Sequence, residues 1–168
     1  MRKRIILEGP DGCSKTTIAY HLSKMTSIPH YQSPHRHLIN DKDVTLFNIL
    51  KYGIHEQLYL AELCDVSVIY DRFFPSEYVY ARVYHRATDF DLIERYDKWW
   101  NRMNGIMIFL DKPNLDKVDH LVMPEMYQNI RHEYENYKLF TSCKHITIDT
   151  SDQDLDKQLL TIISFLKE

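Results

Sequence analysis

Hydrophobic residues form short unbroken runs and longer series with helical spacing, and the two patterns alternate along the chain. Short apolar runs are typical of strands buried on both faces of a sheet. The expected strands span residues 4–8, 30–32, 66–70, 106–110 and 145–149. The helically spaced series predict helices over residues 15–24, 41–52, 54–64, 76–86, 90–103, 124–140 and 155–166, with Gly53 expected to separate the second from the third.

This alternation of strands and helices predicts an α/β fold with right-handed crossovers. A three-layer, doubly wound, five-stranded parallel sheet satisfies it. The chain of 168 residues is expected to form a single domain over residues 1–168, and its 44% hydrophobic and 27% charged residues are ordinary for a soluble globular protein.

Net charge, the N-terminal hydrophobic pattern and cysteine content limit the classes of binding partner and the cellular compartment that we expect. A net charge of −3 provides no general attraction to nucleic acid or to an anionic membrane, so any affinity for phosphate must come from a local cluster. The apolar run near the N-terminus ends at Glu8, which is too short for a signal peptide or a membrane span. Three widely spaced cysteines without a CxxC pair indicate a reducing compartment. We therefore expect a cytoplasmic protein with a small-molecule partner.

A glycine-bearing loop connects the first expected strand to the first expected helix. The order is strand, glycine loop, Lys15-Thr16 and helix, which is the structural context that a phosphate-binding P-loop requires. Lys15 would reach the β- and γ-phosphates, and the Thr16 hydroxyl would bind Mg²⁺. The residues expected to contact the nucleotide are Gly9, Asp11, Gly12, Cys13, Ser14, Lys15, Thr16 and Thr17. A chance glycine turn is the alternative.

Ser14 departs from the P-loop pattern, which has glycine directly before the lysine. A serine can stand there if its backbone avoids a strongly left-handed conformation, at some strain cost. Gly12 is expected to take up part of the bend.

Polar residues gather where the expected strands end, at the edge where parallel sheets bind ligands. Asp71 and Arg72 close the third strand. Arginine can hold a phosphate through two charge-assisted hydrogen bonds, and Asp71 could hold Arg72, Mg²⁺ or the attacking oxygen. A surface ion pair is the alternative. Ser76 and Tyr80 share one face of the next helix, where Tyr80 either contacts a ligand or packs in the core.

Residues 8–12 with 15–17 resemble the E-G-x-D-G-x-G-K-[ST]-T loop of thymidylate kinases, and residues 71–76 resemble their D-R-[YF]-x-x-S motif. Weaker resemblances fall at residues 34–36, at 46–51 and at 148–151. The resemblance implies the fold of P-loop nucleoside monophosphate kinases, with strand order 2-3-1-4-5. The chain would be a compact and divergent member, and a viral origin with a host cytoplasm as its location is left open.

The resemblance also implies ATP and Mg²⁺ as cofactors and a role for each matched residue. Asp11 would meet the 3′-hydroxyl of a deoxyribose, while Asp71 and Glu8 would arrange magnesium, water or the acceptor. The catalytic residues would be Lys15, Arg72, Asp71 and Glu8, and the metal ligands Thr16 and Asp71. The acceptor-binding residues would be Asp11, Arg36, Phe47, Lys51, Arg72, Ser76 and Tyr80.

Two departures from the family pattern affect specificity and catalysis. The short lid region, about residues 112–126, has no arginine, so transition-state charge would fall to Lys15, Mg²⁺ and Arg72, with Arg131 or a partner as further options. Lys51 replaces an arginine and cannot make its two-toothed contact to a base edge, which leaves open whether the base is thymine or a modified pyrimidine.

Three functions remain from the sequence. The leading one is ATP- and Mg²⁺-dependent phosphoryl transfer to a deoxynucleoside monophosphate, because such an acceptor needs positioning and charge neutralisation more than a strong base. The second is a kinase for a deoxynucleoside or for a base hydroxyl within DNA, with Glu8 as the base. The third is a non-catalytic nucleotide-binding module. Trp99-Trp100 is expected in helix packing, with one indole at a dimer surface if the chain forms a homodimer.

Overall fold

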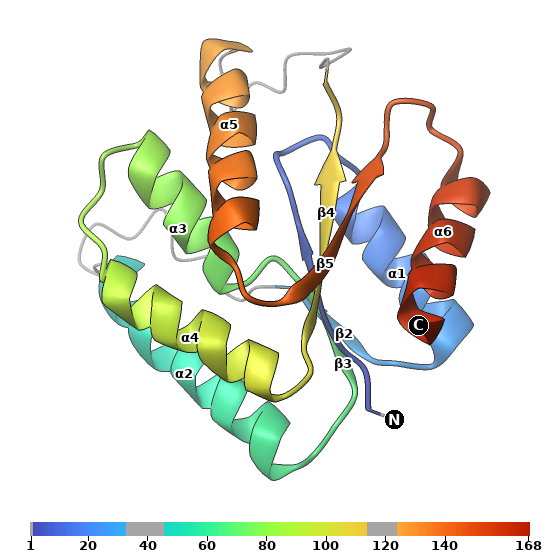
Figure 1. Cartoon of the computed structure of the whole chain (residues 1–168), viewed down its shortest axis with the longest axis horizontal. Helices are drawn as coiled ribbons and strands as arrows, with labels where there is room; N and C mark the ends of the chain where they lie inside the picture. The colour runs from blue at the N-terminus through green and yellow to red at the C-terminus, as the bar shows by residue number, and fades with distance from the viewer. Residues whose placement is uncertain (1, 33–45, 114–123) are drawn as a thin grey trace.

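The computed structural model describes residues 2–32, 46–113 and 124–168. Its sheet has five strands in the order β2-β3-β1-β4-β5, and every neighbouring pair is parallel (Figure 1). The expected fold class and strand order are therefore confirmed. The strands are β1 (Arg4–Glu8), β2 (His30–Gln32), β3 (Val68–Asp71), β4 (Ile106–Asp111) and β5 (Lys144–Asp149).

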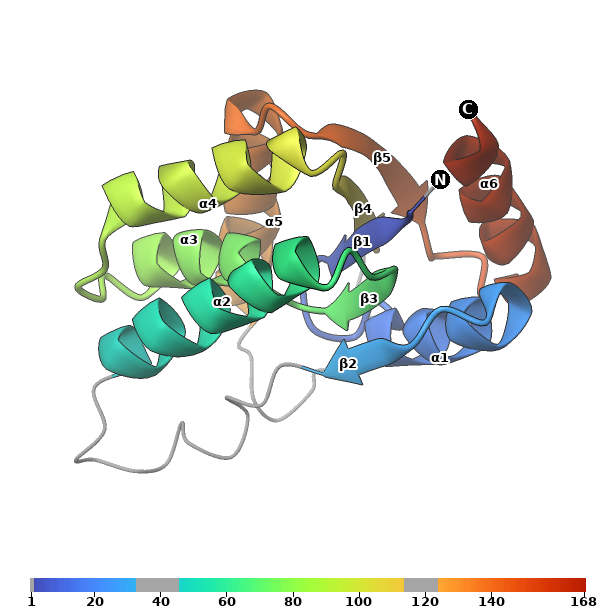
Figure 2. The ribbon, with the colours of Figure 1, turned by 90° about the horizontal axis from the view of Figure 1, so that it is seen from below.

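Helices cover both faces of this sheet and make it the middle of three layers, as the two perpendicular views show (Figures 1 and 2). One face carries α1 (Lys15–Thr26) and α6 (Leu155–Lys167). The other carries α2 (Leu46–Leu63), α3 (Phe74–Val83), α4 (Phe90–Arg102) and α5 (Pro124–Phe140).

The central strand β1 explains why the sequence reads as an unbroken apolar run. All five of its residues are buried, because helices pack on both of its sides. Ile5 and Leu7 belong to the core shared with α1 and α6, and Ile6 belongs to the core shared with α2–α5. Alternate side chains of one strand thus join the two cores.

The tryptophan pair divides between core and surface. Trp100 is fully buried, and its indole fills the space in which a Cβ at Gly105 would lie. Trp99 is half-buried and donates from Nε1 to Glu62 at 2.9 Å. Trp100 therefore packs in the core as the sequence suggested.

Several predicted boundaries were wrong. Gly53 does not separate two helices, because α2 runs unbroken from Leu46 to Leu63. Ile54 and Leu58 are buried in the core, and this burial outweighs the ~1 kcal/mol that a helical glycine costs. Helix α3 begins at Phe74 and ends at Val83, where residues 76–86 were expected. The prediction for residues 41–45 falls outside the described residues.

Among the described helices, none has the length and apolar character needed to cross a bilayer.

Candidate functional site

The loop between β1 and α1 depends on unusual backbone conformations. Gly9 has φ +141°, and a Cβ there would collide with the carbonyl oxygen of Leu110. Gly12 has φ 83° and takes up part of the bend, as expected. Ser14 has φ 58° and ψ 21°, so its backbone is left-handed and the condition stated for a serine at this position is not met. A side chain in that region costs about 1–2 kcal/mol, and the loop tolerates this strain directly before the lysine.

Lys15 is the first residue of α1 and lies inside the loop. Its side chain is buried, and Nζ donates to the carbonyl oxygen of Pro10. Burial, reinforced by the nearby Arg72 charge, lowers the pKa of Lys15 to about 8. Ser14 makes no side-chain cap at this helix, whose N-terminal amides and dipole favour an anion. The loop thus offers an ammonium group and a helix N-terminus to one ligand.

Thr16 and Asp71 bring two oxygen ligands together from different elements. Thr16 lies in the first turn of α1, Asp71 ends β3, and the Thr16 hydroxyl donates to Asp71 Oδ2 at 2.6 Å. Hydroxyl and carboxylate oxygens suit Mg²⁺, which is held by few protein ligands and completes its shell with water and phosphate. The residues present therefore fit this metal.

Arg72 extends back from the end of β3 to the phosphate loop. Its backbone is left-handed at φ 67°, and its N–H donates to the Leu7 carbonyl at 3.0 Å. The guanidinium Nη2 lies 2.5 Å from Asp11 Oδ1, and the group stacks 5.2 Å from the centre of the Tyr80 ring. The two expected halves of the site, the loop and the Asp71-Arg72 pair, are therefore in direct contact.

Tyr80 holds the second oxygen of the same carboxylate. Its hydroxyl donates to Asp11 Oδ2 at 3.0 Å. Burial alone would raise the pKa of Asp11, but the charges of Arg72 and Lys15 outweigh it and hold the pKa below its usual value. Tyr84, on the same helix face, is 42% exposed and stacks on Tyr80 with ring centres 6.0 Å apart.

Glu8 is completely buried and accepts hydrogen bonds from three residues. Its Oε1 accepts from the backbone N–H groups of Phe73 at 2.8 Å and Ser76 at 3.2 Å. Its Oε2 accepts from the Ser76 hydroxyl at 2.6 Å and the Tyr134 hydroxyl at 2.9 Å. Burial raises the pKa of Glu8, although Arg72 and these bonds oppose the shift. In this structure Glu8 therefore acts as a cap for the N-terminus of α3.

Helix α5 contributes side chains that sequence reasoning did not place at the site. Tyr134 contacts Glu8, and Tyr127 donates to the Lys112 carbonyl at 2.7 Å with its hydroxyl 3.5 Å from Cys13 Sγ. The spacing of these tyrosines predicts only a core-facing stripe.

Arg131, which the sequence offered as an option for transition-state charge, forms a two-toothed ion pair with Asp111 in which both distances are 2.7 Å.

Some of the predicted site lies outside the described residues. This holds for Arg36 and for the side chains of Phe47 and Lys51, so their expected roles at the acceptor stay predictions. Thr17 is exposed at the start of α1, beside the loop.

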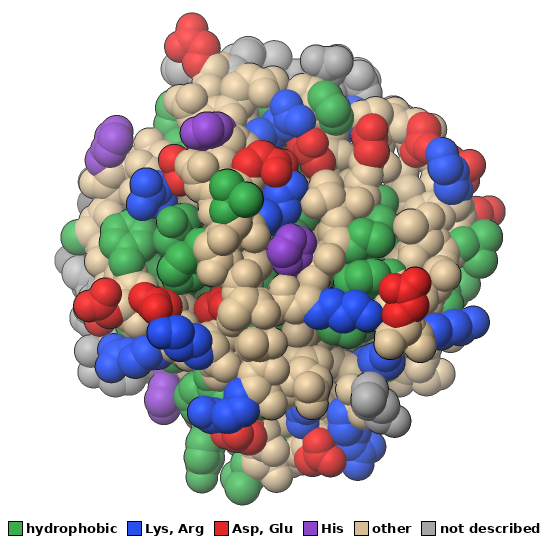
Figure 3. Space-filling model, in the orientation of Figure 1, with side chains coloured by type: hydrophobic (Ala, Val, Ile, Leu, Met, Phe, Trp, Pro, Cys, Tyr) green, Lys and Arg blue, Asp and Glu red, His purple; other side chains and the backbone are tan. Residues whose placement is uncertain are grey.

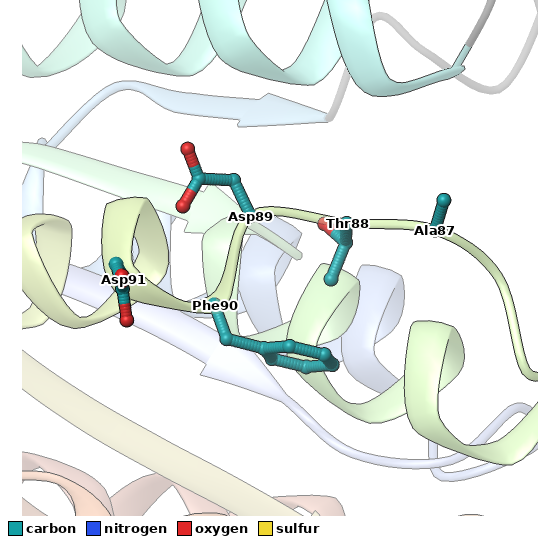
Figure 4. Close-up of a pocket in the computed structure, with 5 residues that line it drawn as sticks. All are labelled: Ala87, Thr88, Asp89, Phe90 and Asp91. Carbon is teal, nitrogen blue, oxygen red and sulfur yellow. The ribbon is translucent and has the colours of Figure 1, made fainter.

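Neither the charge pattern on the face shown in Figure 3 nor the hollow shown in Figure 4 marks this site. On the face shown in Figure 3, acidic and basic side chains are interspersed. A surface hollow of about 580 Å³ is lined by Ala87, Thr88 and Asp89, which precede α4, and by Phe90 and Asp91, the first two residues of α4 (Figure 4). None of these residues takes part in the cluster around Lys15 and Arg72.

A parallel sheet of order 2-3-1-4-5 with a glycine loop between β1 and α1 defines the fold of P-loop nucleotide kinases. Neither a family model nor a curated relative matches the chain. Solved structures do match along nearly its whole length. YorR from Bacillus subtilis, in complex with phosphorylated GDP, is 22% identical with a TM-score of 0.72, covering 98% of this chain and 96% of that one.

Two further structures share the fold. Thymidylate kinase from Ehrlichia chaffeensis is 20% identical with a TM-score of 0.66, covering 99% of this chain and 98% of its own. Deoxyadenosine kinase from M. mycoides, with dCMP and dCDP bound, is 17% identical with a TM-score of 0.62, covering 98% of both chains. The resemblance to thymidylate kinases is thus confirmed at the level of the fold.

Proposed function

We propose that this protein is a kinase that transfers the γ-phosphoryl group of ATP to a deoxynucleoside monophosphate and forms the diphosphate. The observation that carries the proposal is the contact between Arg72 Nη2 and Asp11 Oδ1 at 2.5 Å. It joins a guanidinium group suited to the acceptor phosphate to the loop suited to the donor phosphates. In-line transfer requires the two anions to be held face to face.

On the donor side, Lys15 and the N-terminus of α1 bind the β- and γ-phosphates of ATP. Thr16 and Asp71 would hold Mg²⁺, which supplies charge neutralisation at the donor phosphates. On the acceptor side, Arg72 orients the monophosphate so that one of its oxygens attacks the γ-phosphorus. The bond from phosphorus to the β–γ bridging oxygen then breaks, and ADP leaves with that electron pair.

Four carboxylates that lie in or next to the candidate site favour a monophosphate acceptor over a hydroxyl acceptor. A hydroxyl must lose a proton during transfer and needs a base within reach. Glu8 is fully buried beneath its donors, and Asp11 is held by Arg72 and Tyr80. Asp71 is bonded to Thr16, and Asp111 is bonded to Arg131. A phosphate oxygen is already nucleophilic and needs none of them as a base.

The proposal also covers the base of the acceptor, the cellular compartment and the oligomeric state of the enzyme. The three structural relatives differ in the compounds they are named for or bound to, which are phosphorylated GDP, thymidylate, and deoxyadenosine with dCMP and dCDP. The choice of a pyrimidine therefore rests on the resemblance of Phe47 and Lys51 to a thymine-binding helix. We expect thymidylate or a modified pyrimidine monophosphate as the acceptor of a single kinase domain. A reducing cytoplasm suits the three unpaired cysteines. Homodimer formation is a further option that Trp99, half-buried on α4, leaves open.

The direct test is ADP formation from ATP and Mg²⁺ with a panel of acceptors. The panel contains dTMP, dCMP, dUMP, dAMP, dGMP and GMP together with the matching nucleosides. We expect turnover with a pyrimidine deoxynucleoside monophosphate and none with the nucleosides. Turnover with nucleosides alone would assign a hydroxyl acceptor instead. Nucleotide binding without any turnover would make the protein a binding module.

Two substitutions test the division of roles. Lys15→Ala is expected to abolish turnover. Arg72→Ala is expected to lower kcat/KM for the monophosphate. The expected loss of transition-state stabilisation is about 2–4 kcal/mol, which is typical when one preorganised charge contact is removed. The matched control is Arg82→Ala on α3, whose exposed pair with Glu133 lies outside the cluster. Near-normal activity of Arg72→Ala would show that the acceptor site is assigned wrongly.

A further inference from the structure

Helix α5 places one buried hydroxyl against the acceptor side of the site. Tyr134 is 3% exposed, and its hydroxyl donates to Glu8 Oε2 at 2.9 Å. The Tyr134 hydroxyl oxygen also lies 3.2 Å from the Ser76 hydroxyl and 3.4 Å from Arg72 Nη1. Three groups from β1, α3 and the end of β3 thus meet at one tyrosine.

The guanidinium of Arg72 is held from two sides. Nη2 is bonded to Asp11, whereas Nη1 faces Ser76 Oγ at 3.3 Å and the Tyr134 hydroxyl at 3.4 Å. The plane of a guanidinium decides where its remaining N–H donors point, and a forked contact to phosphate depends on that plane. Without the Nη1 contacts, the bond to Asp11 and the stacking on Tyr80 would remain, but no side-chain oxygen would fix the direction of Nη1.

We propose that Tyr134 is a positioning residue of the kinase. Its hydroxyl fixes the orientation of Arg72 toward the acceptor phosphate, directly and through the Glu8–Ser76 pair. The inference rests on the proposed function and extends it to a residue of α5 that would not touch the substrate.

The same helix contains a matched control. Tyr137 is also fully buried, and its hydroxyl also donates to a buried carboxylate, Asp97 Oδ1 at 3.0 Å. Asp97 further accepts from Thr141 and Ser142, so this second network joins α4 to the segment after α5. The two tyrosines have the same chemistry and burial, and only Tyr134 contacts Arg72.

The experiment compares Tyr134→Phe with Tyr137→Phe, using the monophosphate of the panel that the wild-type enzyme phosphorylates best. We expect Tyr134→Phe to lower kcat/KM for this acceptor roughly tenfold, the scale of one hydrogen bond in a charged network, with the KM for ATP unchanged. Tyr137→Phe should leave both values at the wild-type level. A merely structural role would move the acceptor kinetics of the two variants together.

A double-mutant cycle tests whether Tyr134 acts through Arg72. If it does, Tyr134→Phe costs much less when combined with Arg72→Lys than it costs alone. Additive losses, or equal acceptor kinetics in the two phenylalanine variants, would overturn the inference while leaving the proposed function intact. A wild-type protein that phosphorylates no monophosphate would overturn both. If Tyr134→Phe does not fold, Ser76→Ala removes the other hydroxyl beside Nη1, and its acceptor kcat/KM must then fall while the ATP KM holds.

Discussion

Two residues of the candidate site have backbone conformations that residues other than glycine rarely adopt. Ser14 and Arg72 lie in the left-handed region, with φ 58° and 67°. Neither has the conformational freedom of glycine, so Ser14 adds strain within the phosphate loop and Arg72 adds strain directly after β3. The sequence revealed Ser14 as an exception to the loop pattern, but nothing in it indicated the backbone of Arg72.

The strain at Ser14 gives a first prediction. Ser14→Gly should raise the free energy of unfolding by about 1 kcal/mol, because glycine adopts this φ without penalty and Ser14 makes no capping bond that would be lost. Urea denaturation measures the change. Ser23→Gly, inside α1, is the control and should destabilise by about 0.5 kcal/mol. Destabilisation by both variants would show that Ser14 is not strained.

Lys15 gives a second prediction, on pH dependence. Its pKa falls from 10.5 in the unfolded chain to about 8 in the folded protein, so the unfolded chain binds more protons between these values and wild-type stability rises there with pH. Lys15→Met should therefore be more stable than wild type by about 2–3 kcal/mol at pH 7, although inactive. The difference should narrow by about 1 kcal/mol at pH 9. Thermal unfolding of both proteins at the two pH values checks this, and a constant difference would contradict the lowered pKa.

The strands and most helices could be predicted from local pattern, whereas their ends could not. Helix α3 begins at Phe74 because Glu8, far away in sequence, accepts from the N–H groups of Phe73 and Ser76. Tyr134 lies 126 residues from Glu8, and its helical spacing indicates only burial. Contacts between distant elements thus determine the start of α3 and the hydrogen-bond partner of Tyr134, and local sequence patterns predict neither of them.

The junction of α4 and α5 gives a third prediction. Asp97 is 2% exposed and accepts from the hydroxyls of Tyr137, Thr141 and Ser142 and from the Ser142 N–H. Asp97→Asn replaces one acceptor oxygen by a donor amide, which should destabilise the protein by about 2 kcal/mol without changing the KM for ATP. Urea denaturation with steady-state kinetics measures both. Asp154→Asn, which keeps an exposed helix cap, is the control and should change stability by less than ~0.5 kcal/mol. Equal stability of the two variants would contradict a buried network.

On the scale of the whole molecule, the site lies where both cores meet one edge of the sheet. One core lies beneath α1 and α6, and the other beneath α2–α5. Lys15 and Thr16, which we propose for the donor side, lie on α1 at the first face, whereas Tyr80 and Tyr134 lie on α3 and α5 at the second. A ligand that bridges them would therefore tie the two layers together. The alternation of elements was enough to predict this edge, but not the contribution of α5.

Ligand binding across both layers gives a fourth prediction. ATP with Mg²⁺ at ~100-fold excess over its Kd should stabilise the folded protein by about 2.7 kcal/mol, which raises the Tm of a domain of this size by roughly 5–10 °C. The shift should disappear in Lys15→Ala and shrink when EDTA removes the metal. Calorimetry measures it. An equal shift in Lys15→Ala would mean that ATP binds elsewhere.

The buried cap at Glu8 has a consequence for how the site can be observed. The N–H groups of Phe73 and Ser76 lie at the candidate site, and both donate to Glu8, whose side chain is 0% exposed. Their hydrogens can exchange with deuterium only when the Glu8 cluster opens, so they should exchange as slowly as amides of a central strand. Two amides next to Arg72 would then act as built-in probes of whether the acceptor side is assembled before any nucleotide arrives.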